Sequence, residues 1–96
     1  MTKDYILQFL RENKPYLRDQ FGVQSIALFG SMAKGNQKVD SDIDLLVELT
    51  EPRFQYLMGC ILYLEKKLGN KVDLIRKGPH LRKQFLDSIE KDLIYA

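Results

Sequence analysis

Two aspartates open an apolar run in the middle of the chain, and this run limits the folds available to it. Every second residue from position 43 to 49 is apolar, namely Ile43, Leu45, Val47 and Leu49. This period is typical of a β-strand with one buried face. Asp42 and Asp44 then project from the opposite face. A strand of this kind needs other elements to cover its apolar face, which favours a sheet packed against helices.

The remaining apolar patterns predict the partners of this strand. Pro15 lacks a backbone N–H and is expected to separate two N-terminal helices. We expect helices over Thr2 to Asn13 and from Pro15 to near Gly22, a strand from Val23 to Phe29, a polar connection from Gly30 to Ser41, the strand from Asp42 to Leu49, a helix from Pro52 to Leu68, a strand from Lys71 to Arg76, and a last helix carrying Leu81, Phe85, Ile89 and Leu93.

The connections between these elements predict the topology of the sheet. The second and third strands are joined through a helix, which favours a parallel pair. The first two strands are joined without a full helix, which favours an antiparallel pair. The predicted fold class is therefore α/β (α+β), with a small mixed sheet and helices packed on one face, in a single domain over residues 1–96.

Composition limits the cellular compartment and the classes of partner that we expect. A net charge of +2 over 96 residues gives no ground for direct nucleic-acid binding. No apolar run approaches the roughly 20 residues that a membrane-spanning helix needs. The single cysteine, Cys60, has no partner for an internal disulfide and is expected to pack in the long helix. We expect a cytoplasmic protein without membrane contact.

Three aspartates predict a metal site. Asp73 lies between Val72 and Leu74, so its side chain leaves the third strand opposite the apolar neighbours. If the second and third strands are parallel, Asp42, Asp44 and Asp73 meet near one end of one open face. Carboxylate oxygens select hard cations, and two Mg²⁺ ions can bridge a phosphate there. The alternative is that these acids are solvated residues at strand ends.

Gly30 and Ser31, directly after the first strand, suggest a phosphate site. A glycine lets the backbone approach a phosphate closely, and the Ser31 hydroxyl can donate a hydrogen bond to it. Lys34, three residues further on, is a candidate phosphate contact. Alone, a Gly-Ser pair after a strand is commonly a turn. An antiparallel pairing of the first two strands, however, would bring this pair next to the start of the acidic strand.

These motifs resemble the DNA polymerase β-like nucleotidyltransferases. Gly30-Ser31, ten residues, then Asp42-Ile43-Asp44 is similar to their Gly-Ser-x10-Asp-x-Asp signature, and the string from Leu28 to Gly35 resembles the minimal nucleotidyltransferase (MNT) branch. The stretch from Lys71 to Ile75 is similar to the strand that carries the third acid of the family. Many relatives carry Arg-Ala-Arg where this chain has Met32-Ala33-Lys34, so one cation fewer stands near the triphosphate.

The resemblance implies a reaction and roles for the matching residues. Gly30 and Ser31 would hold the triphosphate of ATP. Asp42 and Asp44 would bind both Mg²⁺ ions, and Asp73 would complete the second metal site and act as general base. A hydroxyl would attack the α-phosphate, take up AMP and release pyrophosphate.

The acceptor is expected on another protein, because the chain continues for only one helix after Asp73. The resemblance implies the antitoxin of a HEPN–MNT pair, which transfers AMP to a tyrosine of a helical HEPN toxin. Two alternatives remain open. One is a non-catalytic module that binds nucleotide or partner and inhibits by occlusion. The other is the catalytic subunit of an enzyme that modifies a small molecule held by a separate subunit.

A basic run follows the third strand. Arg76, Lys77, Arg82 and Lys83 lie close together in the sequence. Such a run is usually a solvated face, and contact with phosphate or with an acidic partner is the alternative. His80, within this stretch, is expected at the surface.

Overall fold

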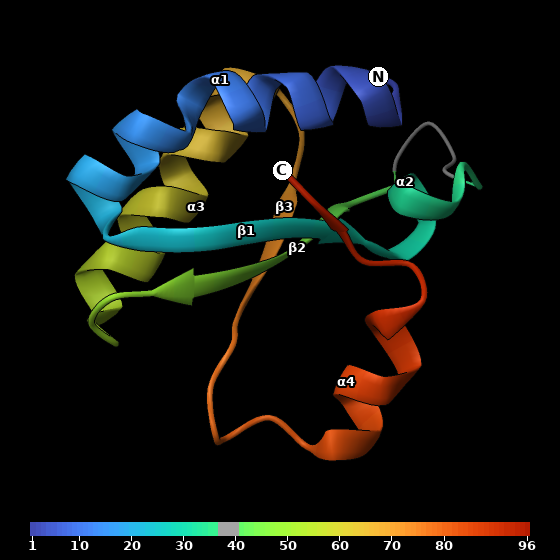
Figure 1. Ribbon diagram of the computed structural model, residues 1–96. Coiled ribbons are helices and arrows are strands. Elements are labelled where there is room, and N and C mark those ends of the chain that lie inside the picture. Colours follow the sequence, from blue (N-terminus) through green and yellow to red (C-terminus); the bar gives the residue numbers. More distant parts are fainter. Residues whose placement is uncertain (37–40) are drawn as a thin grey trace.

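The structure, a computed structural model, describes residues 1–36 and 41–96. Within these two ranges, four helices and four strands alternate (Figure 1). Their order is α1 (Lys3–Phe21), β1 (Val23–Phe29), α2 (Gly30–Lys34), β2 (Ile43–Leu49), α3 (Phe54–Leu68), β3 (Val72–Arg76), α4 (Lys83–Glu90) and β4 (Ile94–Tyr95).

The strands form one mixed sheet in the order β3-β2-β1-β4. β1 and β2 pair antiparallel, and β2 and β3 pair parallel, which confirms both predicted pairings. The C-terminal β4 adds a short antiparallel strand beside β1. The two outer strands of the sheet are therefore β3 and β4, and β3 lies on the side that points away from the viewer in Figure 1.

The main core lies between the sheet and the two long helices. α1 and α3 cover one face of the sheet, as the sequence predicted (Figure 1). α1 and α3 contribute buried residues at helical spacing, and β1, β2 and β3 contribute alternating ones. The fully buried members are Ile6, Leu10, Leu17, Ile26, Leu28, Ile43, Leu45, Val47, Cys60 and Leu64. The expected packing role of Cys60 is thus confirmed, and burial raises the pKa of its thiol to about 12.

A smaller apolar cluster covers part of the second face. Phe29 and Leu46 project there from the sheet, and Ile89 of α4 packs against them. Phe85 of α4 meets the Phe29 ring edge to face at a centroid distance of 6.1 Å. α4 thus lies across the face opposite α1 and α3, an addition to the predicted helices on a single face.

The predicted break at Pro15 was wrong, because α1 runs unbroken from Lys3 to Phe21 with Pro15 inside it. Leu10 and Leu17 are both fully buried on the sheet side, so packing on either side of the proline favours one continuous helix. Pro15 has no N–H to donate to the carbonyl of residue 11. Exposure of Pro15 to solvent lets water reach this position.

Two short elements were not predicted. The stretch expected as a polar connection begins with one helical turn, α2, whose Met32 and Ala33 are buried in the main core. The later part of that connection, residues 37–40, lies outside the described residues. The last predicted helix was also too long, since α4 ends at Glu90 and Leu93 leads into β4. The spacing of apolar residues alone did not show where α2, α4 and β4 begin and end.

No helix among the described residues is both long and apolar enough to cross a membrane.

Replacing Pro15 by alanine should stabilise the protein. Alanine supplies the missing N–H in the middle of α1, and we expect the free energy of unfolding to rise by about 1–2 kcal/mol, after allowance for the greater entropy of the unfolded chain. Urea unfolding of Pro15→Ala measures this. Gln20→Ala, an exposed position on the same helix, is the control, and a fall in stability of Pro15→Ala would show that α1 needs the proline.

Candidate active site

The strand register brings two of the three predicted acids together. Asp44 of β2 pairs with Asp73 of β3, and on its other side Asp44 pairs with Phe29, the last residue of β1. Paired residues in neighbouring strands project from the same face of a sheet. Asp44 and Asp73 therefore lie side by side on the face that α4 partly covers, where β1 ends and where β2 and β3 begin. Asp42 lies two residues before Asp44, at the start of β2.

Gly30 stands against Asp44 at the end of β1. Its φ of 76° lies in the left-handed region, where glycine is favoured. A Cβ atom at this position would overlap with the carboxylate oxygen Oδ2 of Asp44. Glycine is thus required twice here, for the turn into α2 and for the space that the Asp44 side chain fills.

The first turn of α2 faces the same place. The turn begins at Gly30 and continues through Ser31, and N–H groups at the start of a helix have no partner inside it. Gly30 and Ser31 are both partly exposed. Backbone donors and one hydroxyl therefore stand next to the Asp44 carboxylate, which suits an anionic group bridged by a cation.

The charges of the acids are only partly compensated. Burial raises the pKa of Asp44, and repulsion from Asp73 and Asp42 raises it further. Asp42 has a cation nearby, since its Oδ2 lies 3.9 Å from Nζ of Lys71. Across residues 1–36 and 41–96, no three acidic, His or Cys side chains already converge on one cation position. The donor set of carboxylate oxygens fits Mg²⁺, provided that Asp42 turns from Lys71 toward Asp44 and Asp73.

Lys34 forms an ion pair with an acid that the sequence analysis did not identify. Its Nζ lies 3.5 Å from Oδ2 of Asp92, which belongs to the turn between α4 and β4. Lys34 follows Gly30 and Ser31 by one helical turn and so shares their side of α2. Met32, which replaces the first arginine of the family motif, is 4% exposed and packs in the main core. Its side chain therefore lies away from any phosphate at α2.

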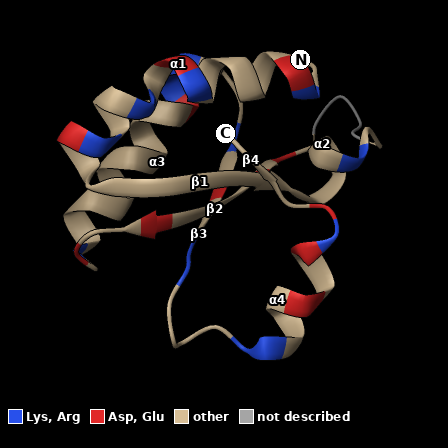
Figure 2. Cartoon of the chain, in the orientation of Figure 1, with Lys and Arg blue, Asp and Glu red and all other residues tan. Residues whose placement is uncertain are grey.

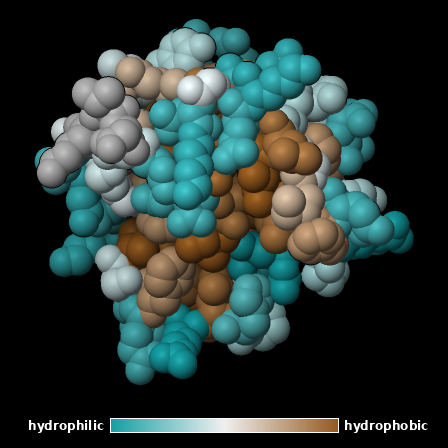
Figure 3. Space-filling model, turned by 180° about the vertical axis from the view of Figure 1, so that it is seen from behind, coloured by the Kyte–Doolittle hydropathy of each residue, from teal (hydrophilic) through white to brown (hydrophobic). Residues whose placement is uncertain are grey.

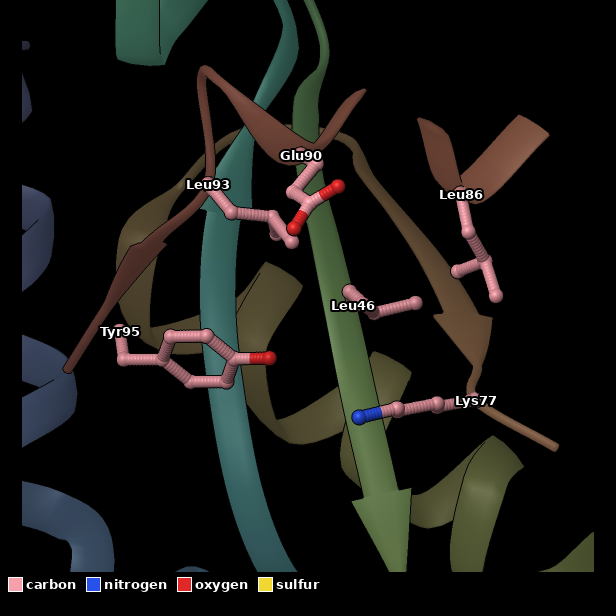
Figure 4. A pocket seen from close by; sticks show the side chains of 6 residues that line it. All are labelled: Leu46, Lys77, Leu86, Glu90, Leu93 and Tyr95. Atoms are coloured by element: carbon pink, nitrogen blue, oxygen red, sulfur yellow. The ribbon is translucent and has the colours of Figure 1, made fainter. Parts of the chain in front are cut away.

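A separate hollow of about 350 Å³ lies between α4 and the sheet (Figure 4). Leu46 forms its floor, Leu86 and Leu93 stand on its sides, and the side chains of Lys77, Glu90 and Tyr95 reach its rim. None of the predicted site residues lines it. This hollow therefore does not coincide with the acids, which lie elsewhere on the same sheet face.

Comparison with known proteins shows the family of the chain. Residues 7–96 match the family model described as a nucleotidyltransferase domain. The chain belongs to this family. It is a nucleotidyltransferase, and its resemblance to the minimal branch is confirmed by the relatives and structures that follow.

Two archaeal relatives match over nearly their whole length. The protein MJ1379 of Methanocaldococcus jannaschii, named as a candidate protein adenylyltransferase, is 48% identical over 99% of this chain and 98% of its own. The protein adenylyltransferase MntA of Thermococcus cleftensis is 35% identical over 100% of this chain and 97% of its own.

Solved structures share the fold. A candidate minimal nucleotidyltransferase matches with a TM-score of 0.79 and 29% identity over 98% of this chain and 95% of that one. A toxin–antitoxin structure with AMP-PNP matches with a TM-score of 0.55 and 30% identity over 79% of this chain and 57% of that one. A complex of tri-AMPylated HEPN toxin with MNT antitoxin from Shewanella oneidensis, at 21% identity and a TM-score of 0.59 over 97% and 66% of the chains, shares the fold alone.

Alanine at Gly30 should cost more than alanine at a comparable glycine. Gly35 has a φ of 77° and open space around its Cβ position, so Gly35→Ala bears only the backbone strain of about 1–2 kcal/mol. Gly30→Ala bears the same strain and also overlaps with Asp44. Urea unfolding should show a larger loss for Gly30→Ala. Equal losses would mean that the Asp44 side chain moves aside freely.

Neutralising Asp44 should stabilise the protein when divalent cations are absent. Because the pKa of Asp44 is raised in the folded state, its ionised form opposes folding above that pKa, and the penalty disappears as the pH falls through it. Asp44→Asn should therefore melt higher than the wild type at pH 7 with EDTA, and the difference should vanish in acid.

Asp87→Asn, on an exposed position of α4, controls for the change in net charge. Added Mg²⁺ should stabilise the wild type and leave Asp44→Asn unchanged. A lower melting temperature for Asp44→Asn in EDTA would contradict this electrostatic account.

Proposed function

We propose that this chain transfers AMP from ATP to a hydroxyl of a partner protein in a Mg²⁺-dependent reaction. The observation that carries the proposal is the strand register, in which Asp44 pairs with Asp73 on one side and Phe29 on the other, next to Gly30. Acids for cations and donors for phosphate thus occupy one end of one sheet face. The relatives named as protein adenylyltransferases support the protein acceptor, and the AMP-PNP of the related toxin–antitoxin structure supports ATP.

Each residue has a defined task in the proposed site. Gly30 and Ser31 hold the triphosphate through backbone N–H groups and the serine hydroxyl. Lys34 exchanges its Asp92 partner for a phosphate oxygen of the nucleotide. Asp42 and Asp44 hold both Mg²⁺ ions, and Asp73 completes the second site. When bound, Mg²⁺ neutralises charge on the triphosphate and favours departure of pyrophosphate.

The proposed reaction is a single in-line displacement. The acceptor oxygen forms a bond with the α-phosphorus while the bond from that phosphorus to the bridging oxygen breaks. The hydroxyl proton passes to the carboxylate of Asp73, and pyrophosphate leaves with the bond electrons. Asp73 is exposed on an outer strand, so an acceptor from another molecule can reach it. Most of the rate then comes from positioning and electrostatic stabilisation.

We propose a helical HEPN-type protein as the acceptor, with a tyrosine as the modified residue and inactivation of that protein, as a toxin, as the consequence. The support is the MNT resemblance together with the related toxin–antitoxin structures.

A label-transfer experiment tests the reaction. The chain, Mg²⁺, α-labelled ATP and the product of the neighbouring gene are mixed, and label on protein is measured. Asp73→Asn should lower the transfer rate at least about 100-fold, because a general base contributes about that much. Asp87→Asn serves as the charge-matched control. A stable complex that gains no label from the wild type would instead support inhibition by occlusion.

A further inference from the structure

The acceptor has to approach from the β3 side of the sheet. β3 is an outer strand, and Asp73, the proposed general base, is exposed near its start. On the other side of Asp44 the sheet continues through β1 to β4, and Phe29 of β1 is covered by Phe85 of α4. The free edge of β3 is therefore the nearest surface on which a second molecule can dock beside Asp73.

This edge presents unpaired backbone groups. The N–H of Lys77 donates to the Val47 carbonyl and that of Ile43 to the Lys71 carbonyl, so the odd-numbered residues of β3 face β2. The N–H groups of the even-numbered residues point outward. Within the described ranges, those of Leu74 and Arg76 have no hydrogen-bond partner. The side chain of Leu74 packs in the main core, and its unpaired N–H on the strand edge would gain from a partner.

Glu65 closes the first part of the same edge. Its Oε2 accepts a hydrogen bond of 3.0 Å from the N–H of Val72. An incoming strand can therefore pair with Leu74 and Arg76, whereas the Val72 N–H is already used. This confines the pairing of a docked segment to the part of β3 from Asp73 onward. A residue opposite Asp73 projects on the same face as its carboxylate, at a cross-strand Cβ separation of about 4.5–5.5 Å.

Apolar side chains of α3 border the open edge of β3. Phe54, Met58 and Ile61 share one side of α3 with Glu65, and the bond from Glu65 to Val72 shows that this side faces β3. Phe54 is 72% exposed. From behind, where β3 is outermost, apolar side chains gather in the middle of the surface and hydrophilic ones surround them (Figure 3).

The charges at the far end of the edge are basic. Lys and Arg residues occur where β3 ends and again where α4 begins (Figure 2). They are Arg76, Lys77, Arg82 and Lys83. Lys71 adds a further cation at the start of β3, with its side chain 75% exposed. These cations disfavour antiparallel pairing of two copies of β3, because that pairing places Arg76 and Lys77 of one copy beside Lys71 of the other, and they favour a partner with carboxylates.

We propose that the open edge of β3 binds an extended acidic segment of the acceptor protein as an added strand and so presents the acceptor hydroxyl to Asp73. The inference rests on the proposed transfer reaction. It specifies the surface that recognises the acceptor, the backbone groups that bind the acceptor and the acidic character of the bound segment. Hydrogen bonds from the Leu74 and Arg76 N–H groups give affinity, and the Glu65 bond at Val72 limits the added strand to the part of β3 from Asp73 onward.

The first test uses a random copolymer of glutamate and tyrosine, which is extended, acidic and rich in hydroxyl groups. With Mg²⁺ and α-labelled ATP, the chain should label this polymer at least about tenfold faster than a lysine–tyrosine copolymer of equal tyrosine content. Equal labelling of both polymers would overturn the charge preference. Label on neither polymer, with label still on the neighbouring gene's product, would overturn the extended-segment inference and leave the proposed function standing. No label on any acceptor would overturn both the extended-segment inference and the proposed function.

Two variants at one position then isolate the backbone contact. Arg76→Ala removes the side chain and keeps the N–H, whereas Arg76→Pro also removes the N–H, which the ladder with β2 does not use. We expect KM for the glutamate–tyrosine polymer to rise about tenfold more in Arg76→Pro than in Arg76→Ala, with kcat similar in both. Equal KM values would overturn the added-strand contact.

Amide exchange keeps the inference testable if Arg76→Pro folds poorly. In the wild-type protein, the glutamate–tyrosine polymer should slow exchange at Leu74 and Arg76 at least about tenfold and leave Ile75, already paired with β2, unchanged. Unchanged exchange at Leu74 and Arg76 would overturn the proposal. Protection of both amides without polymer, rising with protein concentration, would identify a second copy of the chain as the occupant and would overturn it as well.

Discussion

The contact between Gly30 and Asp44 is the constraint around which the rest of the site is arranged. Only a residue without Cβ leaves room for the Asp44 carboxylate at the point where β1 turns into α2. That turn places Gly30 against Asp44, and the antiparallel register of β1 with β2 sets Phe29 opposite Asp44. The parallel pairing of β2 with β3 then adds Asp73 on the other side. Donors for an anion and ligands for a cation thus depend on one close approach of backbone to side chain.

The arrangement has an electrostatic cost that the substrate can offset. Three carboxylates near one strand end repel one another, and burial of Asp44 adds to the penalty. In the free protein Lys71 lies near Asp42, and Asp92 holds Lys34. Both pairs are exposed enough to be weak, so a triphosphate with its Mg²⁺ can replace them at little cost. In the proposed function, the charges that oppose folding of the free protein would favour binding of Mg²⁺ and triphosphate, which is the usual compromise between stability and function.

Much of the fold follows from the sequence, because the sheet is built from patterns of clear period. The alternating run from Ile43 to Leu49 and the helical spacing in α3 gave both strand pairings correctly. Local rules failed where tertiary packing prevailed, as at Pro15, where buried residues on either side keep α1 continuous. α2 and β4 are too short to show a period of their own. In the site, motif spacing indicated the acids and Gly30-Ser31. Asp92 carries no such pattern, because it is far from Lys34 in the sequence, and the hydrogen bond from Val72 to Glu65 depends on how α3 packs against β3.

In the proposed function, α2 and the paired acids form one site for a triphosphate and its cation. Paramagnetic Mn²⁺, a substitute for Mg²⁺, tests it most directly when titrated into the labelled protein together with a non-hydrolysable ATP analogue while amide signals are recorded. Signals of Gly30, Ser31, Asp44 and Asp73 should broaden first and together, and Asp44→Asn should abolish the effect. Broadening centred on the hollow around Glu90 and Tyr95, or at scattered surface acids, would contradict it.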